Sequence, residues 1–439
     1  MLYSYFSPKL LCCFVLLHKM VSCSLAMSIK ASTTTHHHTS HNDEVHHIPS
    51  LDGIGITSIL PVPSTYATYY IGTKRGKGKQ VIIPEDLRGT KQQQQRIQIQ
   101  DIDDANGKSL KPYPVFSMMS VPNHDNDDIG EHNYDLLTGG GDRYVTVWRR
   151  NNEGEWTVVD QLGPHTGWVK DLASCHFSTN VLQSDSGAIN DERIFIFSIG
   201  CNCIEIWSAI DGRYKHIHKL QIESSVEMGC TLSSDLLCLA TYSGNDDNDI
   251  VGTKESYLFA GGVDGCIHRW TLHNNKFLNA GVLSSHDGRV NAIAVCQAMN
   301  VLISVGSDGY FHCREIRDSN PSEWRVVSLS ITDHCGVANR TEVNAQSTQR
   351  KATSLCIVHE ESKQAIIAVG TSCGYVALVN IMKSDDNTVH ASVLKDTSVA
   401  DEEGQVIHAL CSKRYKHSCR ITIGHSNGLS IWDVPIKLL

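Results

Sequence analysis

The chain has 439 residues, of which 41% are hydrophobic and 19% are charged, and its formal net charge is −9. This mixture is too apolar for a disordered protein and too varied for a collagen or a coiled coil. The negative charge excludes a globally basic surface of the nucleic-acid-binding kind, but it leaves room for a local basic patch. Sixteen cysteines are scattered without any C-x-x-C pair, which favours single buried thiols over structural zinc or a disulfide scaffold.

Residues 1–44 are expected to form a disordered or targeting tail. Within it, Leu10–Leu17 is apolar but too short to span a bilayer. Residues 9–26 resemble a secretory signal that ends in a small-residue cleavage site at Ala26. Because Met27 offers an alternative start, a gene-model extension and an ordinary tail remain open alternatives. A histidine-rich stretch near the end of this segment indicates a polar tail, with a metal-binding tract as the alternative.

Seven β-hairpins follow one another along the rest of the chain. Each joins a short apolar run to a second one through a Gly-containing turn. Gly allows positive φ in such turns, and Asp, where it is present, hydrogen-bonds the turn backbone. In chain order the hairpins span residues 69–83, 137–148, 195–207, 259–270, 302–316, 366–379 and 421–433.

Further apolar alternations flank most of these hairpins and predict additional strands. Those before the hairpins are 54–60, 115–121, 168–173, 226–232, 290–295, 353–358 and 406–410. Those after them are 97–99, in a Gln-rich stretch, and 156–161, 214–221, 276–282, 324–330 and 389–395. Four short antiparallel strands repeated seven times predict an all-β fold, a seven-bladed β-propeller over residues 45–439.

The repeated residues resemble the WD-repeat (β-transducin-like) propeller family. The residues that carry the resemblance are Gly140, Asp142, Trp148, His165, Ser198, Trp207, Gly262, Asp264, Trp270, His286, Ser304, Asp308, Trp432 and Asp433. The family often links a turn His, a strand Ser or Thr, a turn Asp and a strand Trp by hydrogen bonds. We interpret these residues as structural, because buried polar groups need partners. No blade has all four, since Asn202 stands near the Asp position of the third blade and Arg314 takes the Trp position of the fifth.

The resemblance also implies how the ring is completed. Propellers of this kind usually finish the last blade with an N-terminal strand, which leaves no open sheet edge. Residues 45–50 are therefore expected to pair with the strand around Leu429–Val434. The alternative is that Pro435–Leu439 supplies that strand itself.

Long insertions and basic residues suggest two different faces. The insertions are expected at 123–132, 178–192, 242–254 and 331–351, and the first three place acidic residues on one face. The opposite, upper face receives the candidate partner-binding residues Lys74, Arg75, Lys77, Lys79, Arg340, Arg350 and Lys351. Electrostatic docking of a partner is one interpretation. The alternative is that these polar insertions are merely solvated surface loops.

The motifs favour a binding protein over an enzyme. The sequence contains no G-x-S-x-G, P-loop or H-E-x-x-H motif, so we predict no catalytic residue, metal or cofactor. We expect a scaffold or adaptor that binds proteins or peptides on its upper face and ring edge, as a monomeric ring in a larger complex. A cytoplasmic or nuclear location without a membrane span is expected. The alternatives are a secretory-route propeller enzyme or sugar-binding protein, and an RNA-associated propeller that docks through its basic loop.

Overall fold

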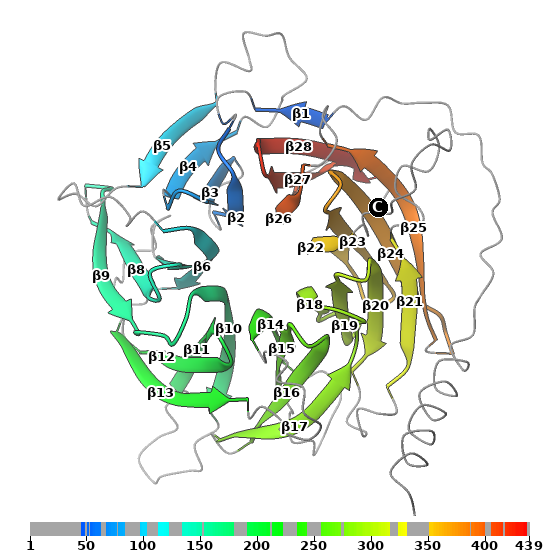
Figure 1. Cartoon of the computed structure of the whole chain (residues 1–439), viewed down its shortest axis with the longest axis horizontal. Helices are drawn as coiled ribbons and strands as arrows, with labels where there is room; N and C mark the ends of the chain where they lie inside the picture. The colour runs from blue at the N-terminus through cyan, green and yellow to red at the C-terminus, as the bar shows by residue number, and fades with distance from the viewer. Residues whose placement is uncertain are drawn as a thin grey trace, which may run out of the picture. The chain divides into compact units, whose positions relative to one another are not determined.

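Seven four-stranded antiparallel sheets, here called blades 1 to 7, surround a central channel in this computed structural model (Figure 1). The predicted seven-bladed architecture is confirmed. The structure describes residues 45–48, 51, 53–62, 67–76, 78–83, 97–102, 113–122, 134–151, 153–179, 191–210, 213–222, 235–243, 256–273, 276–316, 324–331, 351–386, 388–399, 405–415 and 418–436. The tail predicted for residues 1–44 and most of each predicted insertion lie outside these ranges. Among the described residues, no helix is long and apolar enough to cross a membrane.

In blades 1 to 6 the strands follow chain order from the channel outward. Blades 1 and 2 contain β2 (Ile56–Pro61), β3 (Thr68–Thr73), β4 (Gly78–Ile82), β5 (Gln98–Ile102), β6 (Val115–Pro122), β7 (Tyr134–Gly140), β8 (Val145–Arg150) and β9 (Trp156–Leu162). Blades 3 and 4 contain β10 (Val169–Thr179), β11 (Asp191–Gly200), β12 (Cys203–Ile210), β13 (Arg213–Gln221), β14 (Leu236–Tyr242), β15 (Ser256–Gly262), β16 (Cys266–His273) and β17 (Lys276–Ser284). Blades 5 and 6 contain β18 (Val290–Cys296), β19 (Val301–Gly306), β20 (Tyr310–Glu315), β21 (Val326–Ser330), β22 (Ala352–Glu360), β23 (Gln364–Thr371), β24 (Tyr375–Lys383) and β25 (Val389–Ser398).

Blade 7 joins the two ends of the described chain. It contains β26 (Ile407–Arg414), β27 (Ser418–His425), β28 (Gly428–Pro435) and, on the outside, β1 (Val45–His47). β1 runs antiparallel to β28 and places Val45 opposite Trp432 (Figure 1). The backbone N–H of Ile48 extends this contact with a 3.0 Å hydrogen bond to the carbonyl oxygen of Leu429. Pro435, which the alternative assigned to a fourth strand, belongs to β28.

One predicted inner strand is wrong. The sequence suggested residues 226–232 for blade 4, but the strand next to the channel is β14, at Leu236–Tyr242. Residues 226–232 themselves lie outside the described ranges. The apolar run from Leu236 to Ala240 is nearly continuous, because the strand is covered on both faces, so a search for strict alternation passes over it.

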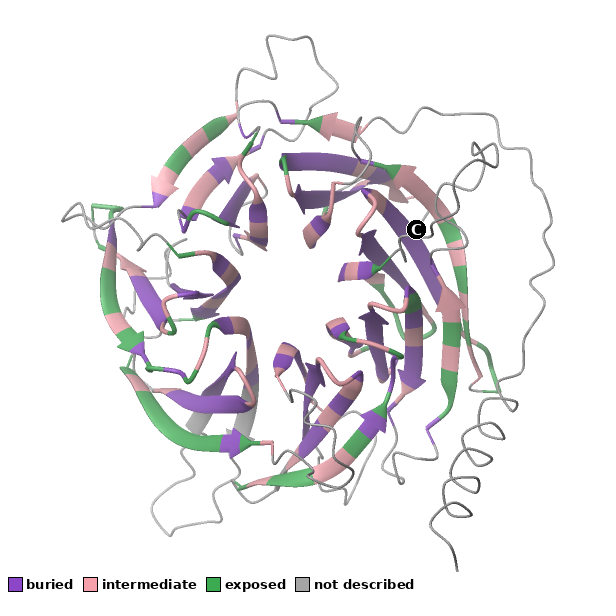
Figure 2. Cartoon of the chain, in the orientation of Figure 1, coloured by how far each residue is buried: buried purple, intermediate pink, exposed green. Residues whose placement is uncertain are grey.

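Apolar side chains fill the seven spaces between neighbouring blades. Each of seven buried clusters draws its residues from two consecutive blades. Tyr70 and Trp148 meet between blades 1 and 2, and Leu429 and Ile56 meet between blades 7 and 1. The middle strands are buried almost throughout, whereas the outer strands alternate between buried and exposed residues (Figure 2). The core is therefore a continuous belt around the channel.

Glycines near the ends of second strands let neighbouring blades approach closely. An added Cβ at Gly261 would lie 2.6 Å from Cγ1 of Val290, the first residue of the next inner strand. Such a contact requires the absence of a side chain. The equivalent pairs are Gly72 with Val115, Gly139 with Val169, Gly370 with Ile407 and Gly424 with Ile56. The glycine that recurs in the hairpins is thus required by packing between blades as well as by the nearby turn.

Candidate functional site

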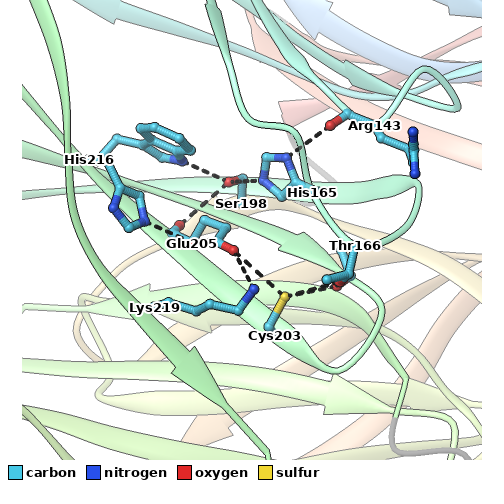
Figure 3. A network of polar contacts seen from close by, with 10 residues as sticks. Arg143, His165, Thr166, Ser198, Cys203, Glu205, His216 and Lys219 are labelled. Carbon is cyan, nitrogen blue, oxygen red and sulfur yellow. Dashed lines mark hydrogen bonds and ion pairs between the residues drawn. The ribbon is translucent and has the colours of Figure 1, made fainter.

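The repeat residues of blade 3 form a buried hydrogen-bond network. Nε2 of His165 lies 2.7 Å from Oγ of Ser198, and Nε1 of Trp207 donates to the same oxygen at 3.0 Å. The second ring nitrogen of His165 lies 3.1 Å from the carbonyl oxygen of Arg143 (Figure 3). Burial lowers the pKa of His165, which keeps the ring neutral at pH 7. All polar atoms of this group therefore have partners within the fold.

Glu205 organises a second polar group in the same blade. Its carboxylate lies 2.8 Å from Nζ of Lys219 and 2.8 Å from Nε2 of His216, both on the outer strand β13 (Figure 3). Burial opposes ionisation of Glu205, but the hydrogen bonds from Lys219 and His216 lower its pKa overall. These contacts connect β12 to β13 and satisfy a carboxylate that is almost inaccessible to solvent.

Blade 5 carries a related network without a tryptophan. Nδ1 of His286 lies 3.0 Å from Oδ1 of Asp308, and its Nε2 lies 3.0 Å from Oγ of Ser304. Burial alone would raise the pKa of Asp308, but the contact with His286 lowers it below its usual value. Arg314 occupies the Trp position and donates a 2.5 Å hydrogen bond to the carbonyl oxygen of Ser284. A guanidinium therefore replaces the indole and still connects to the chain segment before the blade.

His312 lies beside this network and offers a ring nitrogen as a third possible metal ligand. The ligand atoms of His286, Asp308 and His312 lie within 4.8 Å of one another. Both ring nitrogens of His286 are already engaged by Asp308 and Ser304, and Nδ1 of His312 lies 2.9 Å from Oγ of Ser328. A metal ion would have to replace these hydrogen bonds, so we interpret the cluster as part of the structural network of blade 5.

The remaining repeat residues make partial versions of the network. Nε1 of Trp148 donates a 3.0 Å hydrogen bond to Oγ1 of Thr138 in blade 2. In blade 7, Asp433 accepts two hydrogen bonds from the buried Arg420, at 2.8 and 3.0 Å. The other residues of this set lie on the middle strands of their blades or in the turns between them: Gly140, Asp142, Gly262, Asp264, Trp270 and Trp432.

The structure describes four of the seven predicted basic residues, and one of these four is paired within its blade. Here the upper face is the side that carries the turns between second and third strands and the connections between blades. Lys74 and Arg75 are exposed in the β3–β4 turn, and Lys351 is exposed just before β22. Lys79 lies within β4 and forms an ion pair with Asp101 on β5. The other three candidates, Lys77, Arg340 and Arg350, lie outside the described residues.

A β-bulge recurs at the upper end of every inner strand. In each blade the pairing of the inner strand with its neighbour shifts after the first residue. Such bulges redirect a side chain relative to a regular strand. The seven residues at this position are Thr57, Phe116, Lys170, Leu237, Asn291, Thr353 and His408, and all seven line the channel. They form a ring with one member from each blade, which we call the bulge ring.

The bulge ring surrounds a cavity of about 670 Å³ at the upper end of the channel. Several ring members also connect blades, since Nδ2 of Asn291 donates to the carbonyl oxygen of Ala352 at 2.7 Å and Oγ1 of Thr353 donates to that of Ile407 at 2.6 Å. A volume of this size is typical of ligand pockets and accommodates several side chains.

An aromatic and cationic cluster lies on one side of this mouth. The rings of Phe116 and Trp168 stack with centroids 5.7 Å apart. Nζ of Lys170 lies 4.1 Å from the Phe116 centroid and 4.6 Å from that of Trp168. Trp168 is 52% exposed, whereas the other six tryptophans are at most 8% exposed. No sequence motif marks these three residues as a site: Phe116 and Lys170 are the second residues of β6 and β10, and Trp168 directly precedes β10.

Comparisons with known proteins agree with this architecture. No family model matches the sequence. The SEC13 homologues of rat and human are 26% and 25% identical over 124 residues, which is 28% of this chain and 34% of theirs. The chain thus matches about a third of the length of these curated relatives. The structure of U3-55K superposes with a TM-score of 0.57 at 13% identity, and covers 90% of this chain and 98% of its own.

A second solved structure, of the RRP9 WD40 repeats, gives a TM-score of 0.56 at 12% identity over 89% of this chain and 100% of its own. At these identities the likeness concerns the fold. Together with the His–Ser–Trp and His–Ser–Asp hydrogen bonds inside the blades, it shows that the chain has a seven-bladed β-propeller fold similar to that of the WD40-repeat structures.

Proposed function

We propose that the chain is a non-catalytic scaffold that binds a protein or peptide segment at the upper mouth of its channel. The observation that carries the proposal is the exposed Trp168, which borders a 670 Å³ cavity lined by all seven blades. An exposed aromatic ring beside a concave, partly apolar surface is typical of a binding hot spot.

The residues that resemble catalytic groups support a binding role. Ser198 and His165 have the spacing of a nucleophile and a base, but Ser198 is fully buried and its oxygen also accepts from Trp207. A nucleophile must reach its substrate, and this one faces the interior of the blade. We interpret the pair as a structural link between β11, β12 and the preceding turn.

We further propose a cytoplasmic or nuclear location for this scaffold. The eleven described cysteines are free thiols, as expected in a reducing compartment. Burial raises the pKa of Cys411 to about 12 and that of Cys266 to about 11, so neither forms a reactive thiolate at pH 7. Detection of the tagged full chain by microscopy and cell fractionation tests the location, and cleavage after Ala26 would contradict it.

The binding role is tested with the full chain as bait. Proteins captured from cells are compared between the wild type and Trp168→Ala, with Lys351→Ala as a control on the same face but outside the cavity. We expect Trp168→Ala to lose specific partners while the control retains them. If both variants capture the wild-type set, the channel mouth is not the binding site.

A further inference from the structure

The cavity at the channel mouth has an unequal distribution of charge. Lys170 belongs to blade 3 and Lys74 to blade 1, and both line the cavity. Among the described residues, neither ammonium forms an ion pair with a carboxylate. Ring members from blades 4 to 6 are Leu237, Asn291 and Thr353, which carry no charge. Among the described residues that line the cavity, the two lysines therefore lie on the side that blades 1 to 3 form.

Two aromatic rings hold the ammonium group of Lys170 in place. Its ammonium lies over two aromatic rings, which attract a cation through their electron-rich faces. Burial lowers the pKa of Lys170, with Asp235 acting in the opposite direction and Arg289 in the same one. The two aromatic rings favour the charged ammonium and oppose the effect of burial. The ammonium group is thus held in one place, partly removed from water and able to attract an anion.

Lys74 supplies the second charge from a fixed position. An added Cβ on Gly55 would lie 2.6 Å from Cδ of Lys74, so the lysine stem packs directly on the backbone before β2. The backbone N–H of Lys74 also donates a 2.9 Å hydrogen bond to the carbonyl oxygen of Gly55. Burial and, to a smaller extent, the proximity of Lys74 lower the pKa of His408 to about 4, so His408 is a neutral lining residue at pH 7.

The one carboxylate that lines the cavity is occupied by other donors. Asp171 accepts hydrogen bonds from Oγ of Ser117 at 2.9 Å and from the backbone N–H groups of Leu172 and Leu239 at 2.8 Å each. These donors offset its negative charge within the wall. Among the described residues that line the cavity, the two lysines are therefore the charged groups that no carboxylate pairs with.

From this geometry, and resting on the proposed function, we infer that the channel mouth binds an acidic peptide segment. A carboxylate of the segment lies between Lys74 and Lys170, and an adjacent aromatic or apolar side chain packs on the exposed face of Trp168. The uncharged half of the ring accommodates the rest of the segment through Asn291, Thr353 and the apolar Leu237.

The charges around the mouth favour a short acidic segment over a nucleic acid. Asp287 is exposed on the upper face, and Asp235, Asp264 and Asp308 are partly exposed there. A polyanionic backbone needs a continuous basic track to release counter-ions along its length. Two lysines at a mouth that is surrounded by carboxylates match one or two acidic side chains instead.

The test uses the full chain and three labelled synthetic peptides that alternate Tyr with Glu, Gln or Lys. We measure fluorescence anisotropy and the quenching of tryptophan emission by acrylamide, which reaches Trp168 far more readily than the six buried tryptophans. The Tyr-Glu peptide is expected to bind at least roughly tenfold more tightly than the Tyr-Gln peptide and to shield Trp168. Added salt should weaken this preference, because it screens exposed charges.

Two substitutions locate the charge preference. Lys170→Met keeps an unbranched side chain against the two rings, and Lys74→Met keeps the packing on Gly55, but both remove the charge. Each variant should weaken the Tyr-Glu peptide by roughly tenfold and leave the Tyr-Gln peptide unchanged. Lys351→Met is the control, because this exposed lysine lies on the upper face but does not line the cavity. Near-UV circular dichroism verifies that each variant is folded.

Several outcomes would overturn the inference. These are a Tyr-Glu affinity that is unmeasurable or equal to that of Tyr-Gln, an unchanged affinity in both lysine variants, or tighter binding of a labelled oligouridylate that depends on Lys74 and Lys170. The proposed function fails separately. If Trp168→Ala loses cellular partners but neither lysine variant alters them, the mouth binds proteins and only the acidic preference is wrong.

Discussion

The carboxylate of Asp171 on β10 accepts a 2.8 Å hydrogen bond from the backbone N–H of Leu239 on β14. Its other oxygen accepts from Oγ of Ser117 on β6 at 2.9 Å and from the N–H of Leu172 at 2.8 Å. One side chain thereby connects the inner strands of three consecutive blades. Because only a side chain with two acceptor atoms satisfies all three donors, this position distinguishes Asp from its amide.

Substitution Asp171→Asn should lower the free energy of unfolding by about 2 kcal/mol at pH 7. The amide nitrogen of Asn has to face either Leu172 N–H or Leu239 N–H, which leaves a backbone donor without an acceptor. Urea denaturation followed by tryptophan fluorescence measures the change. Asp287→Asn, on the exposed upper face, is the control and should leave stability unaltered. A variant at position 171 as stable as the wild type would show that the link between blades is unimportant.

Stability should also depend on two histidines with unusually low pKa values. Burial, together with the nearby His286 and Arg314, lowers the pKa of His312 to about 3. Burial lowers the pKa of His408 to about 4. Below pH 6.5 the unfolded chain therefore binds protons at these positions before the folded chain does. The free energy of unfolding should fall as pH decreases from 6.5 toward 4, by less than about 1.4 kcal/mol per pH unit for each histidine.

The variants His312→Gln and His408→Gln test this by making the pH dependence shallower in urea titrations between pH 7 and pH 4.5. Asp171 acts in the opposite direction, because burial raises its pKa to about 6 in the folded state. Its contribution to stability increases as pH falls through that value, so Asp171→Asn should make the acid loss steeper. An unchanged slope in all three variants would contradict the assignments.

The blades could be predicted from the sequence because packing between and within them requires the residues that repeat. Gly261 and its equivalents are needed where one blade approaches the next, and Ser198 and Trp207 need each other once buried. The mouth was not predictable in the same way. Phe116 lies at the bulge of β6 in blade 2 and Trp168 directly before β10 of blade 3, so their stacking depends on how two neighbouring blades meet at the channel mouth.

The sequence alone also did not show which charged side chains are exposed and which are paired. Lys79 stands among other cations in the β3–β4 region of the sequence, which suggested a free basic turn. Its alternation along β4 places it opposite Asp101 on β5, where the two form an ion pair. Which of several neighbouring lysines remains available is decided by strand register, and the register depends on a partner strand about twenty residues away.

Removing the shared hydroxyl in blade 3 should be costly. Ser198→Ala deprives both His165 and Trp207 of their partner in a dry interior. We expect a loss of about 2–3 kcal/mol in the free energy of unfolding, measured by urea denaturation, because buried ring nitrogens left without a partner keep their desolvation cost.

A double-mutant cycle separates this hydrogen bond from packing. Trp207→Ser would remove the ring altogether, so Trp207→Phe is preferred, since it keeps an aromatic side chain and removes only the N–H donor. The combined Ser198→Ala and Trp207→Phe variant should lose less stability than the sum of the single variants. Strict additivity would show that the two side chains act independently, despite their 3.0 Å separation.

Deletion of residues 1–50 should destabilise blade 7 although it removes only one short strand of the described ring. β28 would lose the partner that places Val45 opposite Trp432, and the apolar cluster between blades 7 and 1 would lose Ile48. Burial of one such side chain stabilises a fold by about 1.5–3 kcal/mol, and an exposed strand edge promotes association with other chains. Thermal unfolding should therefore begin several degrees lower, accompanied by light scattering. Deletion of residues 1–42 is the matched control, since it leaves β1 and Ile48 in place. If the longer deletion unfolds at the same temperature as the shorter one, pairing between the two ends of the chain does not contribute to the stability of the ring.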